Sequence, residues 1–556
     1  MAQIVPDATL PVNSTVTQQG ATTAIDGGTK AGGNLFHSFR EFSIPTNGEA
    51  YFNNALDIQN IFSRVTGGSI SNIDGLIRAN GSANLFLLNP NGIIFGPNAR
   101  LNIGGSFLAS TASSIRFADD TFFGTTSPQT APLLTISVPI GLQMGRNPGN
   151  ILVQGPGNNL SLNPETGTIT RDNRPVGLQV APGQTLALLG GNLTLEGGNL
   201  TAKSGRIELG SVGGDTLVTL TPMNSGMALS YPEMQNFQDI SLSKAASVDV
   251  SGAGGGDVFV VGRRVTLTDG SVILALTEGA KAGGTLSVRA SETVELIGIS
   301  AEGQFNSSLF VSVAKEATGD GGNLIIETTR LQLVDGGQVG AGTLGAGKAG
   351  NVTVKATDVV ELIGIASNGK SASSLDTSVN SGATGDGGNL TIETARLRVI
   401  DGAQIGAGTF GAGKGGNLTV KATETVEVIG TSADGGVLSG LFASAAPGAT
   451  GNGGNLTIET ARLRVIDGAL VSVDTFGAGK GGNLTVQATD AVELIGTSSD
   501  GNFVSGLFAS VRPGATGDGG NLTIETARLH AINGAQVLVA TFGPGKAGNL
   551  IVKATD

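Results

Sequence analysis

The sequence has no cysteine and no tryptophan, and only 4% of its 556 residues are aromatic. Without cysteine the chain can form neither a disulfide framework nor a thiolate metal site. Its two histidines, His37 and His530, have no second histidine or cysteine nearby with which to bind zinc. We therefore expect no metal and no cofactor, with His37 buried or capping and His530 on the surface.

Positive charge is also scarce. The chain has 32 Lys and Arg against 44 Asp and Glu, a net charge of −12, which argues against a nucleic acid partner because phosphate binding needs a basic face. No apolar run approaches the roughly 20 residues of a membrane-spanning helix, so no membrane span is expected.

Glycine is abundant, with 90 residues, while hydrophobic residues make up 39% of the chain. Many glycines among many Val, Leu, Ile and Thr indicate many short strands and many corners. The apolar content favours a folded chain over a disordered one.

The clearest pattern is an internal repeat of 66 residues. The string Gly-Asn-Leu-(Thr/Ile)-Ile-Glu-Thr recurs with its Asn at 323, 389, 455 and 521, and a sister string has its Asn at 351, 417, 483 and 549. Each period therefore splits into a shorter and a longer half. The longer half carries about ten extra residues, which we place in the variable stretch typified by 432–448. The chain stops partway through a unit, so we expect it to be a fragment.

Within each half, apolar residues alternate with polar ones. Leu390 and Ile392 face one way, and Leu397 and Val399 follow on the opposite parity, so the chain must turn near 394–395. Asp401-Gly402 supplies the next corner. Val426 and Val428 of the sister string sit one offset later, so one corner must differ by a residue between alternate coils.

Short strands with Gly corners, repeated in this way, predict an all-β right-handed parallel β-helix with 66-residue double-coil repeats. Glycine at nearly every dozenth residue excludes a helical solenoid. We expect the repeated asparagines to stack as a ladder of side-chain amides; they are Asn323, Asn351, Asn389, Asn417, Asn455, Asn483, Asn521 and Asn549. The alternation predicts that Leu397 faces the core and Arg398 faces solvent. Leu397→Asp should therefore destabilise the fold strongly, whereas Arg398→Asp should be nearly neutral.

Several apparent motifs are better explained by the repeat. Asn-Leu-Thr looks like a glycosylation site but opens every coil, and Gly-Asp-Gly-Gly at Asp320, Asp386 and Asp518 resembles a calcium loop. Those carboxylates lie two coils apart, too far to share an ion that needs about six oxygens. A carbohydrate-active enzyme would need carboxylates converging on one groove, whereas here the repeat spreads them. We therefore expect no catalytic residues and no enzyme.

The stretch FLLNPNGIIFGPNA contains two proline turns. Pro90 presets φ for a turn, Asn89 can hydrogen-bond its own downstream backbone, and Asn91 tolerates left-handed geometry. Asn89-Pro90-Asn91-Gly92 therefore predicts a corner between two apolar triplets, with Ile93 facing inward.

Around this stretch the chain resembles a known family. Asn34-Leu-Phe-His-Ser-Phe, Phe42-Ser-Ile-Pro, Phe62-Ser-Arg-Val-Thr-Gly and Leu88-Asn-Pro-Asn-Gly-Ile-Ile-Phe-Gly resemble the filamentous-haemagglutinin N-terminal secretion domain, also called the haemagglutination activity or two-partner secretion domain. The Gly-rich cyanobacterial branch is most similar. Gly190-Gly-Asn-Leu-Thr-Leu and Ser204-Gly-Arg-Ile-Glu-Leu-Gly-Ser are similar to its continuation, so the resemblance covers 2–250.

The resemblance implies an N-terminal β-helix with a capping sheet, which POTRA modules of a cognate outer-membrane barrel recognise in the periplasm. The family's secretion motif maps onto Asn89, Pro90, Asn91, Gly92 and Ile93. A second, upstream motif maps onto Asn53 and Asn54, where its proline is missing.

The resemblance thus implies a secretion domain over 2–250, and the repeats predict a β-helix rod over 251–556. The protein would be a secreted, surface-displayed adhesin that binds cells, matrix or polysaccharide. Alternatives are a structural sheath or surface-layer filament and the stalk of a contact-delivered toxin with its effector beyond residue 556. No signal peptide is present, and Met1-Ala-Gln resembles a mature N-terminus with a methionine added.

Overall fold

The protein is described from a computed structural model over residues 3–125, 134–163, 168–171, 175–223, 226–231 and 236–555. The described residues form strands, turns and short connections, and none of their segments is a helix that could cross a membrane. The chain divides into two compact units: unit 1 comprises Met1–Asn159, Asn173–Val250 and Gly256–Val265, and unit 2 comprises Leu160–Asp172, Ser251–Gly255 and Thr266–Asp556. Each unit is built on parallel coils, and the predicted right-handed parallel β-helix is confirmed.

Unit 1 has three rows of parallel strands. The first row is β5 (Asn34–Phe42), β7 (Asn60–Val65), β10 (Asn84–Leu88), β13 (Phe107–Ser110), β21 (Thr185–Gly190) and β24 (Arg206–Ser211). The second is β8 (Ser71–Ile73), β11 (Ile93–Phe95), β17 (Ile151–Gln154), β22 (Leu193–Glu196) and β27 (Ile240–Ser243). The third begins with β3 (Thr22–Gly27), β6 (Glu49–Phe52), β9 (Leu76–Ala79) and β12 (Arg100–Asn102).

The N-terminal segment caps these coils with antiparallel strands. β1 (Ile4–Pro6) pairs with β5, and β2 (Ser14–Gln19) pairs with β3. His37 on β5 is buried beneath this cap and lies 3.0 Å from the Ser14 hydroxyl through Nδ1, which confirms its predicted buried role. Burial lowers the His37 pKa to about 4, so the imidazole is neutral near pH 7.

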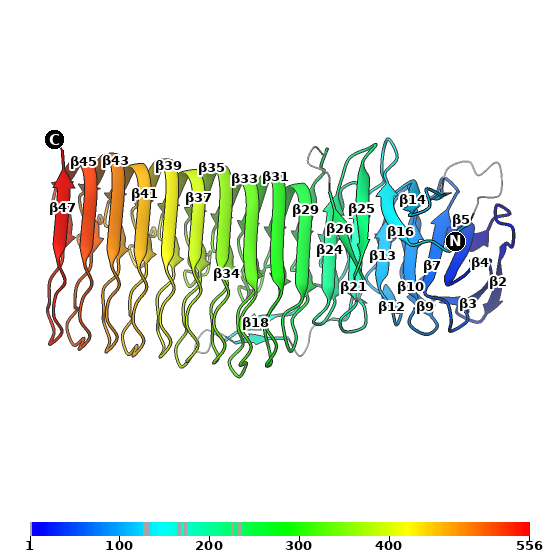
Figure 1. The fold of residues 1–556 in the computed structure, drawn as a ribbon, viewed down its shortest axis with the longest axis horizontal. Helices are drawn as coiled ribbons and strands as arrows, with labels where there is room; N and C mark the ends of the chain where they lie inside the picture. Colours follow the sequence, from blue (N-terminus) through cyan, green and yellow to red (C-terminus); the bar gives the residue numbers. More distant parts are fainter. Residues whose placement is uncertain are drawn as a thin grey trace. The chain divides into compact units, whose positions relative to one another are not determined.

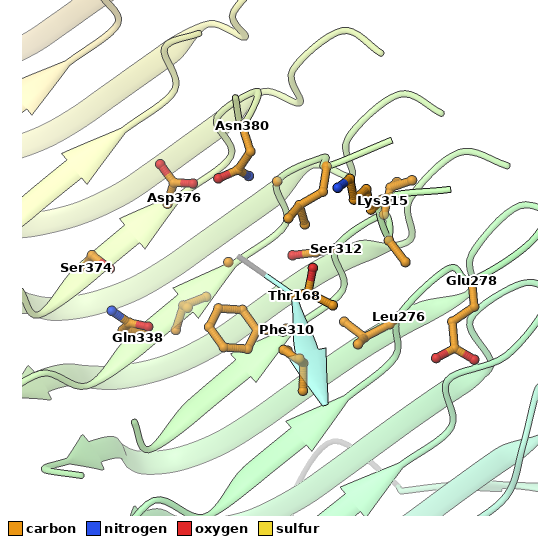
Figure 2. A pocket seen from close by; sticks show the side chains of 17 residues that line it. Thr168, Leu276, Glu278, Phe310, Ser312, Lys315, Gln338, Ser374, Asp376 and Asn380 are labelled. Atoms are coloured by element: carbon orange, nitrogen blue, oxygen red, sulfur yellow. The ribbon is translucent and has the colours of Figure 1, made fainter. Parts of the chain in front are cut away.

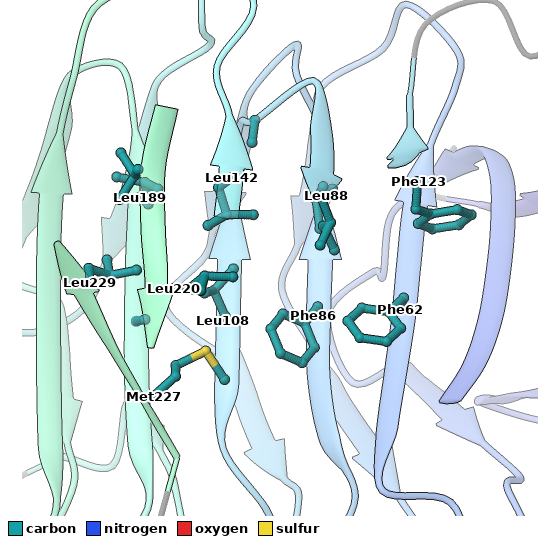
Figure 3. Packing of buried hydrophobic residues seen from close by; sticks show 14 of the residues in the cluster. Phe62, Phe86, Leu88, Leu108, Phe123, Leu142, Leu189, Leu220, Met227 and Leu229 are labelled. Atoms are coloured by element: carbon teal, nitrogen blue, oxygen red, sulfur yellow. The ribbon is translucent and has the colours of Figure 1, made fainter. Parts of the chain in front are cut away.

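The apolar triplets around β10 are explained by burial on both sides of the first row. Leu85 and Leu87 lie on one side of β10 and Phe86 and Leu88 on the other, and all four are buried. A second sheet covers the outer side: β14 (Ser114–Phe117), β15 (Phe122–Gly124), β16 (Pro139–Gln143), β25 (Leu217–Pro222) and β26 (Met227–Ser230). Figure 3 shows Phe62, Phe86 and Leu108 packed in this outer layer with Leu142 and Leu220. A strand buried on both faces needs no polar alternation.

Unit 2 stacks long strands in register, side by side in Figure 1. They are β31 (Thr285–Ile297), β33 (Asn323–Val334), β35 (Val352–Ile363), β37 (Leu390–Ile400), β39 (Leu418–Ile429), β41 (Leu456–Ile466), β43 (Leu484–Ile495), β45 (Leu522–Ile532) and β47 (Leu550–Ala554). Each of the complete coils also has a short strand: β30 (Val272–Leu274), β32 (Ser308–Phe310), β34 (Gln338–Gly340), β36 (Ser374–Asp376), β38 (Gln404–Gly406), β40 (Gly440–Phe442), β42 (Leu470–Ser472), β44 (Gly506–Phe508) and β46 (Gln536–Leu538).

The corners follow the expected pattern. The pairing of β37 with β39 is interrupted at one corner. There a single residue, Ala395, separates Thr394 from Arg396 in β37, whereas two residues separate Ala422 from Thr425 in β39. This confirms the predicted one-residue difference between alternate coils. Asp401 and Gly402 have φ of 57° and 90°, so the Asp-Gly pair turns the chain in the left-handed region as predicted.

The extra residues of the longer coils form a small hairpin loop before the short strand. Its bases pair at Ile365 with Ala372 and at Thr431 with Leu438. The insertion thus lies within the predicted stretch 432–448 and takes up its first part, because residues from Gly440 onward belong to β40 and the turn after it.

The repeated Gly-Asn pairs bring neighbouring coils into close contact. Asn417 Nδ2 donates to Asn389 Oδ1 at 3.2 Å, and Asn455 Nδ2 donates to Asn417 Oδ1 at 3.2 Å. At the preceding residue, a Cβ on Gly416 would overlap the carbonyl oxygen of Gly388 in the coil before it. Glycine is required there because the two backbones touch.

The Gly-Asp-Gly-Gly carboxylates also link coils. Asp320 Oδ1 accepts a hydrogen bond from Lys348 N at 3.0 Å, and Asp386 Oδ1 accepts one from Lys414 N at 2.9 Å. Among the described residues, no group of three or more His, Cys, Asp or Glu side chains is placed to hold a metal ion. His530 is exposed on β45, in agreement with its predicted surface position.

Candidate secretion-partner surface

The corner between β10 and β11 is formed by the predicted motif Asn89-Pro90-Asn91-Gly92. Gly92 N donates to Asn89 O at 3.2 Å, which closes a turn, and Gly92 has φ of 128°. A Cβ on Gly92 would approach Asn150 O at 3.1 Å. Both the backbone angle and the space therefore favour glycine.

The two asparagine side chains of the motif are turned into the protein. Asn89 is fully buried, and its Nδ2 donates to Ser69 O at 3.0 Å and to Ser71 Oγ at 2.9 Å. Its Oδ1 accepts from Asn91 N at 3.0 Å, while Asn91 Nδ2 donates to Gly67 O at 2.7 Å. These bonds tie the corner to the segment before β8.

The motif is also bonded to the following coil. Pro90 O accepts from Gly149 N at 2.9 Å, and Ile93 N donates to Asn150 O at 3.0 Å. Ile93 is buried, as predicted for its inward position. The corner is thus held between the coil before it and the coil after it, so a change in its shape would be passed to both.

The upstream residues form a second, similar corner at the end of β6. Asn54 is buried and exchanges hydrogen bonds with Asn80: Asn80 N donates to Asn54 Oδ1 at 2.9 Å, and Asn54 Nδ2 donates to Asn80 O at 3.1 Å. Asn53 is exposed and donates to Asp26 Oδ1 at 2.7 Å. The two motifs end strands of different sheets, β6 and β10, so the structure does not gather them into one cluster.

An exposed aliphatic side chain lies beside the main corner. Ile70 is 45% exposed, and its Cγ1 lies 3.6 Å from the position of a Cβ on Gly92. Leu56, two residues after Asn54, is 78% exposed. Each corner therefore has one buried asparagine, Asn89 or Asn54, and an exposed aliphatic side chain near it.

Sequence reasoning missed a buried cation under the N-terminal cap. Arg64 is 1% exposed; its Nε donates to Ser38 Oγ at 2.9 Å and its Nη2 to Thr9 Oγ1 at 2.9 Å. Burial lowers the Arg64 pKa to about 10, opposed by the charge of Asp7. The Asp7 pKa is lowered as well: its burial, which raises it, is outweighed by hydrogen bonds from Thr66, Thr9 and Ser38.

A second amide ladder was also missed. Asn60 Nδ2 donates to Asn34 Oδ1 and Asn84 Nδ2 donates to Asn60 Oδ1, both at 3.0 Å. The sequence does carry a signal for it, because each asparagine opens the same pattern Asn-(Leu/Ile)-Phe at 34, 60 and 84. The spacing of these residues is shorter than the 66-residue period, which obscured them.

Comparisons with known proteins agree with the geometry. A family profile described as the TPS secretion domain matches residues 2–260. The heme/hemopexin-binding protein of Haemophilus influenzae is 34% identical over 113 residues, which cover 20% of this chain and 11% of that protein. The chain thus matches about a tenth of that relative's length.

Two solved secretion domains are among the structures to which this chain is similar. The HMW1 secretion domain from Haemophilus influenzae has a TM-score of 0.36 and 16% identity, with 99% of this chain and 100% of that one covered. The filamentous hemagglutinin secretion domain has a TM-score of 0.30 and 15% identity, with 63% and 96% covered. With the profile match and the β-helix of unit 1, residues 2–260 belong to the TPS secretion domain family, whose members are exported through the outer membrane by a cognate transporter.

Proposed function

We propose that this chain functions in a surface-displayed adhesin. Residues 2–250 are recognised by POTRA modules of the cognate transporter, and residues 251–556 form a repeat β-helix that presents binding surfaces to cells, matrix or polysaccharide. The observation that supports export is the corner at Asn89. The side-chain amides of Asn89 and Asn91 bond it to the preceding coil, and its backbone is bonded to the following coil, so its shape is fixed.

Adhesion is favoured over an inert sheath by a repeated exposed aromatic in unit 2. Phe410, Phe476 and Phe542 occupy the same position in successive 66-residue units and are 53%, 39% and 57% exposed. Because the same exposed ring recurs along one face of the coils, we infer that this row of rings is an interaction surface. No catalytic role is proposed, since the repeat distributes the carboxylates of unit 2 along the coils.

The export step is tested with Gly92→Val in a two-plasmid secretion assay and in binding of the purified chain to POTRA modules. Valine at φ of 128° costs about 1–3 kcal/mol, which the packed coils can absorb. We expect a folded chain whose POTRA affinity falls at least about tenfold, a loss of ~1.4 kcal/mol. Ile70→Asp should weaken binding without affecting the turn.

Gly183→Val is the matched control. Gly183 has φ of 79° in unit 1, and no atom lies within 4 Å of the position of its Cβ, so it carries similar backbone strain at an unrelated turn. Secretion of this variant should be normal. Normal secretion of a chain with both proline turns scrambled would show that the corner serves packing alone.

A further inference from the structure

A groove runs along the outer face of the short strands in unit 2. It has a volume of about 520 Å³ and extends across β34, β36, β38, β40 and β42. At a coil spacing of ~4.8 Å these five strands span about 20 Å. The hairpin loops before the strands, through Lys370 and Leu438, form one wall, and the turns after the strands, through Phe410, Pro447 and Phe476, form the other.

The same face is covered by the chain itself at one end. The hairpin of β18 (Ser161–Leu162) and β19 (Ile169–Thr170) crosses the coils there, as Figure 2 shows beside Thr168 and Phe310. Its neighbour Leu160 and its Ile169 pack with Leu274, Phe305 and Phe310, and Arg171 forms an ion pair with Glu278. Gln338, Ser374 and Asp376 border both this covered part and the open groove. The face therefore accepts an elongated occupant lying across the coils.

Aromatic rings line the open part at regular intervals. Phe410 and Phe476 are two coils apart, about 9.6 Å along the stack. Phe442 lies between them, with its ring so close to Gly440 that a Cβ there would overlap it. Phe508 and Phe476 hold the guanidinium of Arg512, with centroid distances of 5.2 and 5.8 Å.

The groove carries no net charge. Its charged lining residues are Lys370, Asp376, Asp474 and Arg512. Asp474 is 1% exposed and is neutralised by Arg512, whose Nε donates to Asp474 Oδ2 at 2.7 Å. Serine hydroxyls and Gln338 and Gln404 supply the remaining polar groups. A polyanion would find no excess of cationic side chains among these lining residues, and the chain as a whole has a net charge of −12.

An extended peptide is also a poor match. The short strands that line the groove are hydrogen-bonded to neighbours on both sides, as β38 is to β36 and β40, so they offer no free edge for a peptide backbone. A sugar polymer instead places its apolar ring faces on aromatic side chains and its hydroxyls toward amides, serines and water. We propose that this groove binds an extended uncharged polysaccharide; the inference rests on the proposed adhesive function and gives that function its ligand class.

The groove is arranged to bind and not to cleave. Asp376 and Asp474 belong to coils three steps apart, or about 14 Å. Paired carboxyl groups that hydrolyse glycosides are about 5–9.5 Å apart. The groove should therefore bind the polysaccharide without hydrolysing its glycosidic bonds.

The test is affinity electrophoresis of the full chain in gels containing hydroxyethyl cellulose, amylose or dextran, with alginate as the polyanion. We expect retardation by at least one uncharged polymer and none by alginate. Phe410→Ala/Phe476→Ala should weaken that binding at least tenfold. Phe122→Ala, which removes a 51% exposed ring from unit 1, should leave it unchanged.

Retardation by no uncharged polymer, or by alginate alone, would overturn the proposal, as would equal binding by the double variant with an unchanged melting temperature. Loss of self-association in the double variant, without any glycan binding, would reassign the face to a second copy. Whole-cell binding separates this inference from the proposed function. Adhesion that survives the double substitution would refute polysaccharide binding by the groove and support the adhesin. Absence of adhesion by both the wild-type chain and the double variant would refute the adhesin.

Discussion

At the residue scale, the same substitution to Asp should have different effects on stability at the neighbouring positions Leu397 and Arg398. Leu397 is fully buried, so Leu397→Asp leaves an unpaired charge in the core and should cost at least about 3 kcal/mol. Arg398 is on the surface but pairs with Glu361 and, at 3.3 Å, with Glu427. Arg398→Asp would place three carboxylates in a row.

The expectation of a nearly neutral Arg398→Asp is therefore revised to a loss of about 1 kcal/mol, still well below that of Leu397→Asp. Urea unfolding of both variants measures the difference. Added salt should reduce the Arg398→Asp effect and leave the Leu397→Asp effect unchanged. Equal losses would mean that the assigned facing is incorrect.

Glu208 in unit 1 makes stability depend on pH. It is fully buried, its Oε1 accepts from Arg206 Nε at 2.6 Å, and burial raises its pKa to about 7 against the opposing effect of Arg206. Because the folded state holds this proton more tightly than the unfolded state, raising the pH from about 4.5 to about 7 lowers stability. The loss is on the order of 3 kcal/mol at most.

Glu208→Gln should flatten the pH dependence of the melting temperature in that window. Glu316→Gln, at an exposed position of unit 2, is the control and should retain the wild-type slope. A wild-type chain that gains stability between pH 5 and 7 while Glu208→Gln does not would contradict the assigned direction.

At the scale of the element, the coil depends on two kinds of glycine. Gly416 is needed for space, because a Cβ would overlap the carbonyl oxygen of Gly388, whereas Gly448 is needed for its φ of 82° and has no atom within 4 Å of its Cβ position. Gly416→Ala should cost about 2–3 kcal/mol through overpacking of two backbones. Gly448→Ala should cost about 1 kcal/mol through backbone strain alone.

Hydrogen exchange separates the two effects. Gly416→Ala should increase exchange in β37 and β39, which it forces apart, while Gly448→Ala should affect only the turn around it. Similar exchange profiles for the two variants would show that contact between coils does not limit local stability.

At the scale of the molecule, hydrogen bonds between side-chain and backbone groups join neighbouring coils at the asparagine ladder and the Gly-Asp-Gly-Gly corners. The asparagine ladder and the Asp320 and Asp386 corners use their oxygens in hydrogen bonds to the next coil. Calcium ions need about six to eight oxygen ligands, so chelator should leave the melting temperature within about a degree. A clear drop on adding chelator, reversed by calcium, would identify the Gly-Asp-Gly-Gly corners as ligands.

The sequence by itself determined what recurs along the chain. Four features follow from backbone angles and alternating burial within one coil. They are the 66-residue period, the inward position of Leu397, the left-handed corner at Asp401-Gly402, and the extra residue opposite Ala395. Such local patterns are encoded residue by residue, so they can be read before the coils are assembled. The turn at Asn89 to Gly92 was predictable for the same reason.

The tertiary structure decided which distant segments meet. Phe86 is buried because β14, β15, β16, β25 and β26 cover β10, and Asn89 finds its partners in Ser69 and Ser71. Arg64 is buried with Thr9, and the groove arises where loops of alternate coils align beside Phe410 and Phe476. These pairings depend on apolar area and hydrogen bonds summed over many residues far apart in the chain, and no local pattern specifies which of several possible covers is used.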